Sequence, residues 1–174
     1  MPAGTRTRPT SDRAREGLFA TITAVHGPLE RARVLDLYAG SGAVGLEALS
    51  RGAARVLFVE SDPAAVRVIR ANMTAVGLTG GQLIAGTVGA VLRRGPGAGP
   101  RFNVVVADPP YAAGDDEVAA MLAALLQGRW LAPGALLAVE RASRAGPVPW
   151  PAGYSFDRSR RYGEATFWYG LAAG

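Results

Sequence analysis

The sequence has no cysteine, no lysine and a single histidine, His26, among its 174 residues. Without cysteine the chain has no disulfide, no thiol nucleophile and no thiolate zinc site, and one histidine excludes histidine-rich metal centres. A Ser-His-Asp triad would have to use His26. No stretch approaches the roughly 18 apolar residues of a membrane span, and no apolar signal segment follows the N-terminal arginines. We therefore expect a cytoplasmic protein with no metal site and no membrane association.

All nineteen basic residues are arginine, and the formal net charge is +5. The excess lies at the two ends: residues 1–33 carry a net +3 and residues 141–161 a net +4, around a middle of −1. This distribution favours contact with a polyanion at both ends, and nucleic acid is the first candidate. The alternative is that these arginines are solvated surface residues of a chain encoded by a GC-rich genome.

The length predicts a single domain over residues 1–174. Short apolar runs alternate with helical patterns, which predicts a mostly parallel sheet with helices on both faces. Two further strands on either side of Gly163 predict a closing hairpin over residues 154–171, which adds one antiparallel strand to the sheet. At the other end of the chain, we expect residues 1–27 to form a basic segment and a helix. Strands are predicted over 33–38, 55–59, 82–85, 103–107, 135–139, 154–162 and 164–171, and helices over 11–25, 42–49, 63–76, 115–127 and a weak one ending at 94.

A glycine-rich loop follows the first predicted strand. Gly40-Ser41-Gly42-Ala43-Val44-Gly45 matches G-x-G-x-x-G before a helix, and Glu60 ends the next strand 20 residues after Gly40. Glycines admit a ligand close to the backbone, a helix N-terminus offers free N–H groups, and a carboxylate binds ribose hydroxyls. The pattern predicts an adenosine-containing ligand, and by itself it would indicate NAD.

Asp36 argues against NAD because it lies inside the strand, four residues before Gly40. A carboxylate there would attract a cationic ligand and repel a pyrophosphate. S-adenosylmethionine carries a sulfonium and an ammonium group, so it fits better. Alternatively, Asp36 caps the backbone of the loop, which is compatible with either ligand.

A second motif, Asp108-Pro109-Pro110-Tyr111, follows the fourth predicted strand. Ligands of open α/β sheets bind beyond the carboxyl ends of the strands. The Asp108 carboxylate and the Pro109 carbonyl can both accept hydrogen bonds from one amino group, which turns the nitrogen lone pair toward an electrophile. The second proline stiffens the turn, and Tyr111 offers a ring for stacking. In isolation the tetrapeptide could be a simple turn, but its place after an adenosine-type loop favours chemistry at an amino group.

These motifs together resemble class I S-adenosylmethionine-dependent methyltransferases that methylate amino groups, whose motif is [DNS]-P-P-[YFW]. Arg8-Pro9-Thr10, Asp12-Arg13, Arg15-Glu16 and Leu18-Phe19 further resemble the R-P-T-x-D-x-x-R-E-x-L-F segment of bacterial 16S rRNA guanine-N2 methyltransferases, as does the loop region 36–52. The resemblance covers about residues 6–170. It implies a Rossmann-like, seven-stranded fold, S-adenosylmethionine as cofactor, and guanine N2 of 16S ribosomal RNA as the methylated atom. It also implies a monomer that acts on a small-subunit particle.

The resemblance implies roles for individual residues. Asp108, Pro109, Pro110 and Tyr111 would be catalytic. The cofactor would contact Asp36, Tyr38, Ala39, Gly40, Ser41, Gly42, Glu60, Ser61, Thr87, Val88 and Asp108, with adenine read by backbone groups or by the Thr87 hydroxyl. Apart from the resemblance, the charge excess at the two ends makes six arginines the candidates for contacts with RNA phosphates: Arg8, Arg13, Arg15, Arg158, Arg160 and Arg161.

The sequence departs from the resembled family in two places and leaves three other functions open. After the third predicted strand, related methyltransferases often carry Asp or Asn to bond the adenine amino group, whereas this chain has Gly86-Thr87-Val88. The family usually begins with an additional segment rich in glycine and arginine, whereas Arg8 here lies seven residues from Met1, so we expect that arm to be missing. An adenine-N6 methyltransferase acting on DNA or RNA would use the same tetrapeptide. Methylation of a protein glutamine is less favoured, because that class prefers asparagine in place of Asp108. An NAD-binding oxidoreductase is the alternative outside the methyltransferases.

Overall fold

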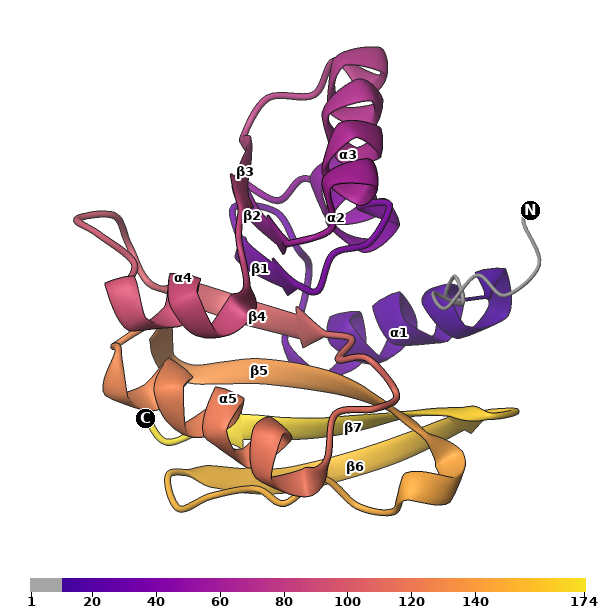
Figure 1. The fold of residues 1–174 in the computed structure, drawn as a ribbon, viewed down its shortest axis with the longest axis vertical. Helices are drawn as coiled ribbons and strands as arrows, with labels where there is room; N and C mark the ends of the chain where they lie inside the picture. Colours follow the sequence, from indigo (N-terminus) through magenta and orange to yellow (C-terminus); the bar gives the residue numbers. More distant parts are fainter. Residues whose placement is uncertain (1–10) are drawn as a thin grey trace.

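The computed structural model describes residues 11–174, which form one seven-stranded sheet flanked by helices (Figure 1). The strands are β1 (Arg33–Leu37), β2 (Arg55–Glu60), β3 (Gly81–Ala85), β4 (Phe102–Ala107), β5 (Leu131–Ala142), β6 (Tyr154–Tyr162) and β7 (Ala165–Ala172). The helices are α1 (Asp12–Val25), α2 (Ala43–Ser50), α3 (Pro63–Val76), α4 (Val88–Arg94), α5 (Asp115–Gln127) and a 3₁₀ helix, η1 (Ser143–Ala145).

The strand order is β3-β2-β1-β4-β5-β7-β6. Strands β1 to β5 pair in parallel, and β7 pairs antiparallel with both β5 and β6. The predicted mostly parallel sheet closed by a hairpin, with one antiparallel strand, is confirmed. The order reverses between β1 and β4, and the carboxyl ends of these neighbouring strands are where an open α/β sheet binds its ligand.

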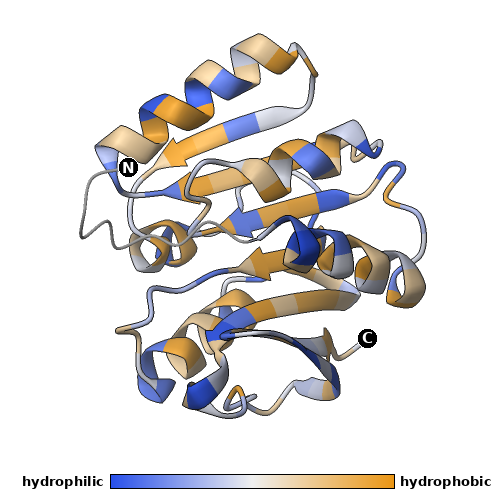
Figure 2. Cartoon of the chain, turned by 90° about the vertical axis from the view of Figure 1, so that its right-hand side faces the viewer, coloured by the Kyte–Doolittle hydropathy of each residue, from blue (hydrophilic) through white to orange (hydrophobic). Residues whose placement is uncertain are grey.

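Helices cover both faces of the sheet, as continuous apolar strands require. On one face α1, α2 and α3 contribute Leu18, Ala48 and Ile69 to a core with alternate strand residues, and on the other face α4 and α5 contribute Leu92 and Leu122. Figure 2 shows strands in the interior that are largely hydrophobic, and helices that carry both hydrophobic and hydrophilic residues. Because helices cover both faces, we expect a ligand to bind at the carboxyl ends of the strands.

Local capping explains why the helix boundaries were predicted closely. The Ser11 hydroxyl accepts a hydrogen bond from the amide of Ala14 at 3.1 Å, so α1 begins one residue later than predicted. Asp62 caps α3 in the same way before Pro63, and Gly77 ends that helix at a φ of +70°. These are the side chains preferred at such positions. The predicted bounds of α3 and α5 are confirmed.

The largest difference concerns β5, which was predicted over 135–139 and spans Leu131–Ala142. Its polar end, Glu140-Arg141, lies beyond the predicted strand. Both side chains are buried, at 5% and 7% exposure, and this part of the strand pairs with β7 up to Ala142. Arg141 tolerates burial because it forms an ion pair with Asp115 on α5, at 3.1 Å.

Candidate active site

The glycine-rich loop connects β1 to α2, and each glycine of its motif has a physical reason. Gly40 and Gly42 have φ angles of +60° and +81°, which side chains disfavour. A Cβ on Gly45 would lie 2.2 Å from Cε1 of Phe58, so this glycine lets α2 approach β2 closely. The loop thus has the tight turn and the close helix–sheet packing of an adenosine site.

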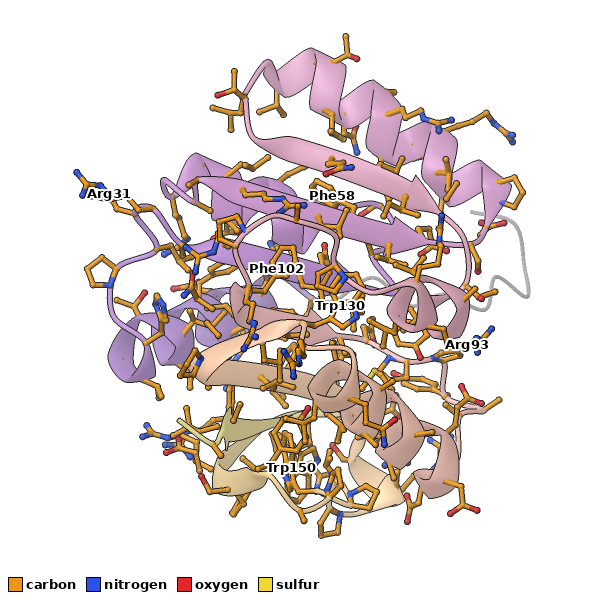
Figure 3. The ribbon with its side chains drawn as sticks, turned by 90° about the vertical axis from the view of Figure 1, so that its left-hand side faces the viewer. Arg31, Phe58, Arg93, Phe102, Trp130 and Trp150 are labelled. Atoms are coloured by element: carbon orange, nitrogen blue, oxygen red, sulfur yellow. The ribbon has the colours of Figure 1, made fainter. Side chains whose placement is uncertain are left out.

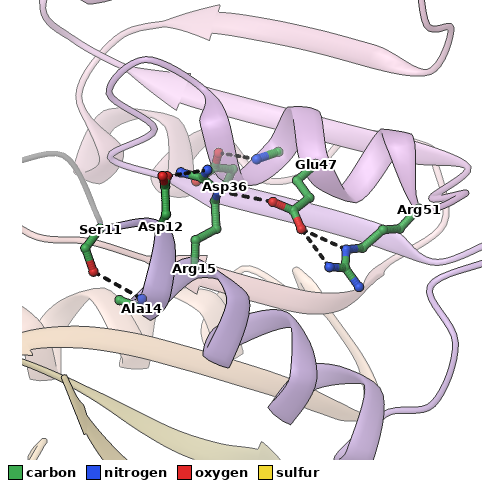
Figure 4. Close-up of polar contacts among 8 residues, drawn as sticks. Ser11, Asp12, Ala14, Arg15, Asp36, Glu47 and Arg51 are labelled. Carbon is green, nitrogen blue, oxygen red and sulfur yellow. Dashed lines mark hydrogen bonds and ion pairs between the residues drawn. The ribbon is translucent and has the colours of Figure 1, made fainter.

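Asp36 lies beneath this loop and is 3% exposed. Its Oδ2 accepts a hydrogen bond from the amide of Gly45 at 3.0 Å (Figure 4). Burial is the main reason why the pKa of Asp36 rises to about 8; the bond from Gly45 lowers that pKa, and the charge of Glu60 raises it further. Of the two roles considered for Asp36, the structure shows the cap of the loop backbone.

Glu60 ends β2 and binds the backbone on two sides. Its Oε1 accepts from the amide of Gly40 at 2.7 Å, and its Oε2 accepts from the amides of Ser61 and Asp62 at 3.0 and 2.8 Å. The carboxylate therefore joins the glycine loop to the turn after β2. Contact with ribose hydroxyls, expected from the sequence, remains a prediction.

Asp108 follows β4, and its amide donates to the Leu37 carbonyl of β1 at 3.3 Å. Burial, followed by the charges of Glu140 and Asp36, raises the pKa of Asp108 well above its usual range. The register pairs Asp36 with Val106 and Val106 with Ala138, which places Asp36, Asp108 and Glu140 on the same face of three adjacent strands. Glu140 was not predicted as a site residue. The sequence did offer a signal for it, because Glu140 is an acidic residue that directly follows the predicted strand 135–139.

The turn after Asp108 presents an aromatic ring. The Pro110 carbonyl accepts from the amide of Ala113 at 2.9 Å, and Tyr111 is 44% exposed. The Arg144 guanidinium of η1 lies 5.9 Å from the centre of the Tyr111 ring, within range of a cation–π contact. Tyr111 is thus accessible for stacking at the edge of the sheet where Asp108 lies.

A pocket of about 470 Å³ lies next to this edge, between the ends of the strands and helices α4 and α5. The predicted site residues that line it are Tyr38, Glu60, Ser61, Thr87, Val88 and Pro110. The lining residues that were not predicted are Val59, Gly86, Gly89, Leu92, Arg93, Glu117, Ala120, Met121 and Ala124. The remaining predicted residues, which do not line the pocket, are Asp36, Ala39, Gly40, Ser41, Gly42, Asp108, Pro109 and Tyr111.

Two predicted lining residues have additional local roles. Tyr38 has a φ of +57°, a left-handed conformation that a tyrosine seldom adopts, and it starts the loop directly after β1. Burial, with a smaller effect of the Glu117 charge, raises the pKa of Tyr38 to about 12, so its hydroxyl remains a hydrogen-bond donor. The Thr87 hydroxyl accepts from the amide of Ala90 at 3.2 Å and caps α4.

The predicted RNA-contacting arginines are not equivalent. Arg8 lies outside the described residues. Arg13 is exposed on α1, whereas Arg15 forms ion pairs with Asp12 and Glu47 at 2.9 and 3.1 Å (Figure 4). Glu47 also binds Arg51 at 2.7 Å, so the charge of Arg15 belongs to a network of side chains between α1 and α2.

The arginines of β6 divide between the two faces of the sheet. Arg158 and Arg160 pair with Tyr169 and Phe167 of β7, which belong to the core on the α1 side. Arg161 therefore points to the opposite face. Arg158 binds Asp157 at 2.5 Å, whereas Arg160 and Arg161 are exposed. The structure thus brings Arg158 and Arg160, but not Arg161, to the face covered by α1.

Comparisons with known proteins show the family to which the chain belongs. A family described as "Conserved hypothetical protein 95" matches residues 1–170. The chain belongs to this family. Ribosomal RNA small subunit methyltransferase D of Escherichia coli (strain K12) is 34% identical over 167 residues, covering 96% of this chain and 80% of that protein. Its counterpart in Haemophilus influenzae is 30% identical over 161 residues, covering 92% and 80%.

A solved structure confirms the fold. A protein described as a candidate methyltransferase from Escherichia coli superposes with a TM-score of 0.83 at 30% identity, covering 99% of this chain and 91% of that one. The family's fold is therefore the Rossmann-like methyltransferase fold that the sequence predicted. The chain also spans most of the length of these members of the family.

Proposed function

We propose that this chain is an S-adenosylmethionine-dependent methyltransferase that methylates the exocyclic amino group of a base in ribosomal RNA, guanine N2 of 16S rRNA in particular. The observation that carries the proposal is the position of Asp108-Pro109-Pro110-Tyr111. This turn follows β4, directly beside the glycine-rich loop that follows β1. An amine-binding turn next to an adenosine-type loop is the arrangement that methyl transfer to an amino group requires.

The relatives support the substrate. The Escherichia coli and Haemophilus influenzae proteins carry the name ribosomal RNA small subunit methyltransferase D. Since the chain shares about a third of its residues with the former over nearly its whole length, the same class of substrate is the natural proposal. Action on an assembled small-subunit particle, a monomeric state and a cytoplasmic location stay predictions.

The residues present fit S-adenosylmethionine better than NAD. The pocket of about 470 Å³ carries Glu60 at the position of a ribose-binding carboxylate. Asp36, Asp108 and Glu140 lie beside the loop on one face of the sheet, and the charges of Glu140 and Asp36 add to burial in raising the pKa of Asp108. A sulfonium compensates such a cluster, whereas a pyrophosphate would be repelled by it. The bound cofactor would supply an electrophilic methyl group.

The protein's own part is to hold the amine in line with that methyl group. The Asp108 carboxylate and the Pro109 carbonyl accept the two N–H bonds, and the base stacks on Tyr111. Positioning of this kind can contribute on the order of 7–11 kcal/mol of barrier reduction. No strong base is needed, because the methylated product nitrogen loses its proton readily. The base must leave its stack to enter the site.

The RNA would lie across the side of the sheet covered by α1. Arg13, Arg158 and Arg160 share this side, and Arg15 is partly neutralised by Asp12 and Glu47. Arginine contacts to phosphates orient an RNA without reading its sequence. Within residues 11–174, no helix is both long and apolar enough to cross a bilayer.

Two measurements test the function. Titration calorimetry compares binding of S-adenosylhomocysteine with binding of NADH, and a preference for NADH would contradict the proposal. Mass spectrometry of 16S rRNA nucleosides from cells with and without the protein identifies the product. Loss of N2-methylguanosine is the expected result, and loss of N6-methyladenosine would favour the adenine-N6 alternative.

A further inference from the structure

The pocket between α4 and α5 is lined in part by apolar side chains. Leu92 of α4 and Met121 of α5 provide apolar walls, together with Ala120 and Ala124. Glu117, Ala120, Met121 and Ala124 follow the spacing i, i+3, i+4 and i+7, so a single face of α5 lines the pocket. The only acidic side chain on that face is Glu117.

Adenine presents an amino donor and ring-nitrogen acceptors at its edges. The amino group needs a hydrogen-bond acceptor. Two of the side-chain acceptors in the pocket already accept hydrogen bonds from backbone amides. Glu60 already accepts from three backbone amides, and the Thr87 oxygen accepts from the amide of Ala90. The Thr87 hydroxyl can donate its proton to a ring nitrogen, which complements an amino acceptor located elsewhere.

Glu117 has the required chemistry and location. It is exposed in the first turn of α5 and lines the pocket, and its charge acts on Tyr38 across the same space. Its neighbours in that turn differ: Asp115 is engaged with Arg141, and Asp116 is exposed and does not line the pocket. A carboxylate accepts hydrogen bonds only, so it distinguishes an amino group from an oxo group.

We propose that Glu117 accepts a hydrogen bond from the 6-amino group of the cofactor's adenine and makes the pocket selective for adenosine over 6-oxo nucleosides. This inference rests on the proposed function, since it assumes that the pocket holds the adenosine half of S-adenosylmethionine. It adds a residue on α5 to the adenine reading that the sequence assigned to Thr87 and backbone groups.

The test compares S-adenosylhomocysteine with S-inosylhomocysteine, which carries an oxo group in place of the amino group. Calorimetry on the wild type should show at least a tenfold preference for the adenosine compound. Glu117→Gln introduces an amide that can also donate to the oxo group, so the preference should fall to about threefold or less. Asp116→Asn makes the same charge change in the same turn and should leave the wild-type preference intact.

The outcomes separate this inference from the function on which it rests. An unchanged preference in Glu117→Gln, with S-adenosylhomocysteine still bound, would overturn the role of Glu117 and leave the proposed function standing. An equal loss of preference in Asp116→Asn would also overturn it, because a general charge effect would then be responsible. No binding of S-adenosylhomocysteine by the wild type would contradict the proposed function itself. Thermal melting of both variants verifies that they fold.

Discussion

Glu60 Oε1 lies 2.7 Å from the amide nitrogen of Gly40, so the acidic residue that ends β2 holds the glycine loop that follows β1. The other carboxylate oxygen binds the amides of Ser61 and Asp62. The two elements of the adenosine motif are therefore joined to each other before any ligand arrives. This preorganisation lowers the free-energy cost of ordering the loop when a ligand binds.

Replacement of Glu60 by glutamine should weaken cofactor binding and also lower the melting temperature. Glutamine offers a single acceptor oxygen and no charge, so the backbone amides lose charge-assisted partners. We expect a loss of roughly 1.5–3 kcal/mol in the binding of S-adenosylhomocysteine, measured by calorimetry. Glu30→Gln, at an exposed residue before β1, is the matched control. If affinity is unchanged, the ribose is held elsewhere, with Asp62 the next candidate.

Asp108→Ala should abolish methyl transfer while S-adenosylhomocysteine affinity changes only a few fold. The carboxylate is needed to orient the amine, but it does not line the adenosine pocket. Removing it relieves repulsion with Glu140 and Asp36, so the variant should fold. Transfer of a labelled methyl group to 16S rRNA measures the effect. Activity above about a tenth of wild type, equivalent to a barrier change below ~1.4 kcal/mol, would show that Asp108 is not the orienting group.

Asp36 gives a prediction about stability and pH. Its pKa in the folded protein is raised from 3.8 to about 8, so between these values the native state binds a proton that the unfolded chain lacks. The contribution of Asp36 to the free energy of unfolding is therefore fully present below about pH 4, falls as the pH rises, and levels off above about pH 8. Asp36→Asn, which keeps an acceptor for Gly45, should remove this part of the pH dependence.

Urea denaturation at pH 5 and pH 8.5 measures the difference between wild type and Asp36→Asn. The variant's gain in stability relative to wild type should be larger at pH 8.5. Asp108 titrates in the same direction. Because the charge of Asp36 raises the pKa of Asp108, Asp36→Asn also lowers that pKa, which adds to the variant's gain at pH 8.5. A gain that is equal at both pH values would show that Asp36 keeps an ordinary pKa.

The sequence predicted the sheet and the places of its two motifs at the ends of strands. It could do so because apolar runs, capping residues and glycines determine the local structure of the segments in which they lie. Ser11, Asp62 and Gly77 define helix ends through contacts within a few residues. Glu140 and Glu117 were missed because their positions depend on long-range packing. Glu140 reaches Asp108 through the pairing of β4 with β5, and Glu117 reaches the pocket only because α5 packs beside α4.

The arginines were predicted as one group, and the structure divides them. Register on β6 cannot be deduced from composition, because a shift of one residue exchanges the two faces. The pairing of Arg160 with Phe167 places it on the α1 side, and Arg161 falls on the other. We therefore expect Arg160, and not Arg161, to contribute to RNA binding.

Arg160→Glu should weaken RNA binding and flatten its salt dependence more than Arg161→Glu does. Each lost phosphate contact should reduce the slope of log K against log salt by about 0.7 for single-stranded RNA. Filter binding to a 16S rRNA fragment at several salt concentrations measures the slope. Arg158→Glu should act less than Arg160→Glu, because Arg158 already binds Asp157 at 2.5 Å.

Arg31→Glu provides the control for net charge. Arg31 is exposed in the turn before β1, at the amino ends of the strands, and Figure 3 shows it at the edge of the molecule. The substitution changes the charge by the same two units but lies at the amino ends of the parallel strands, at the opposite end of the sheet from Arg160. If Arg31→Glu and Arg160→Glu reduce RNA affinity and slope equally, the effect is one of overall charge, and the arginines of β6 are ordinary surface residues. If only Arg160→Glu does so while S-adenosylhomocysteine binds normally, the α1 side of the sheet is the RNA surface.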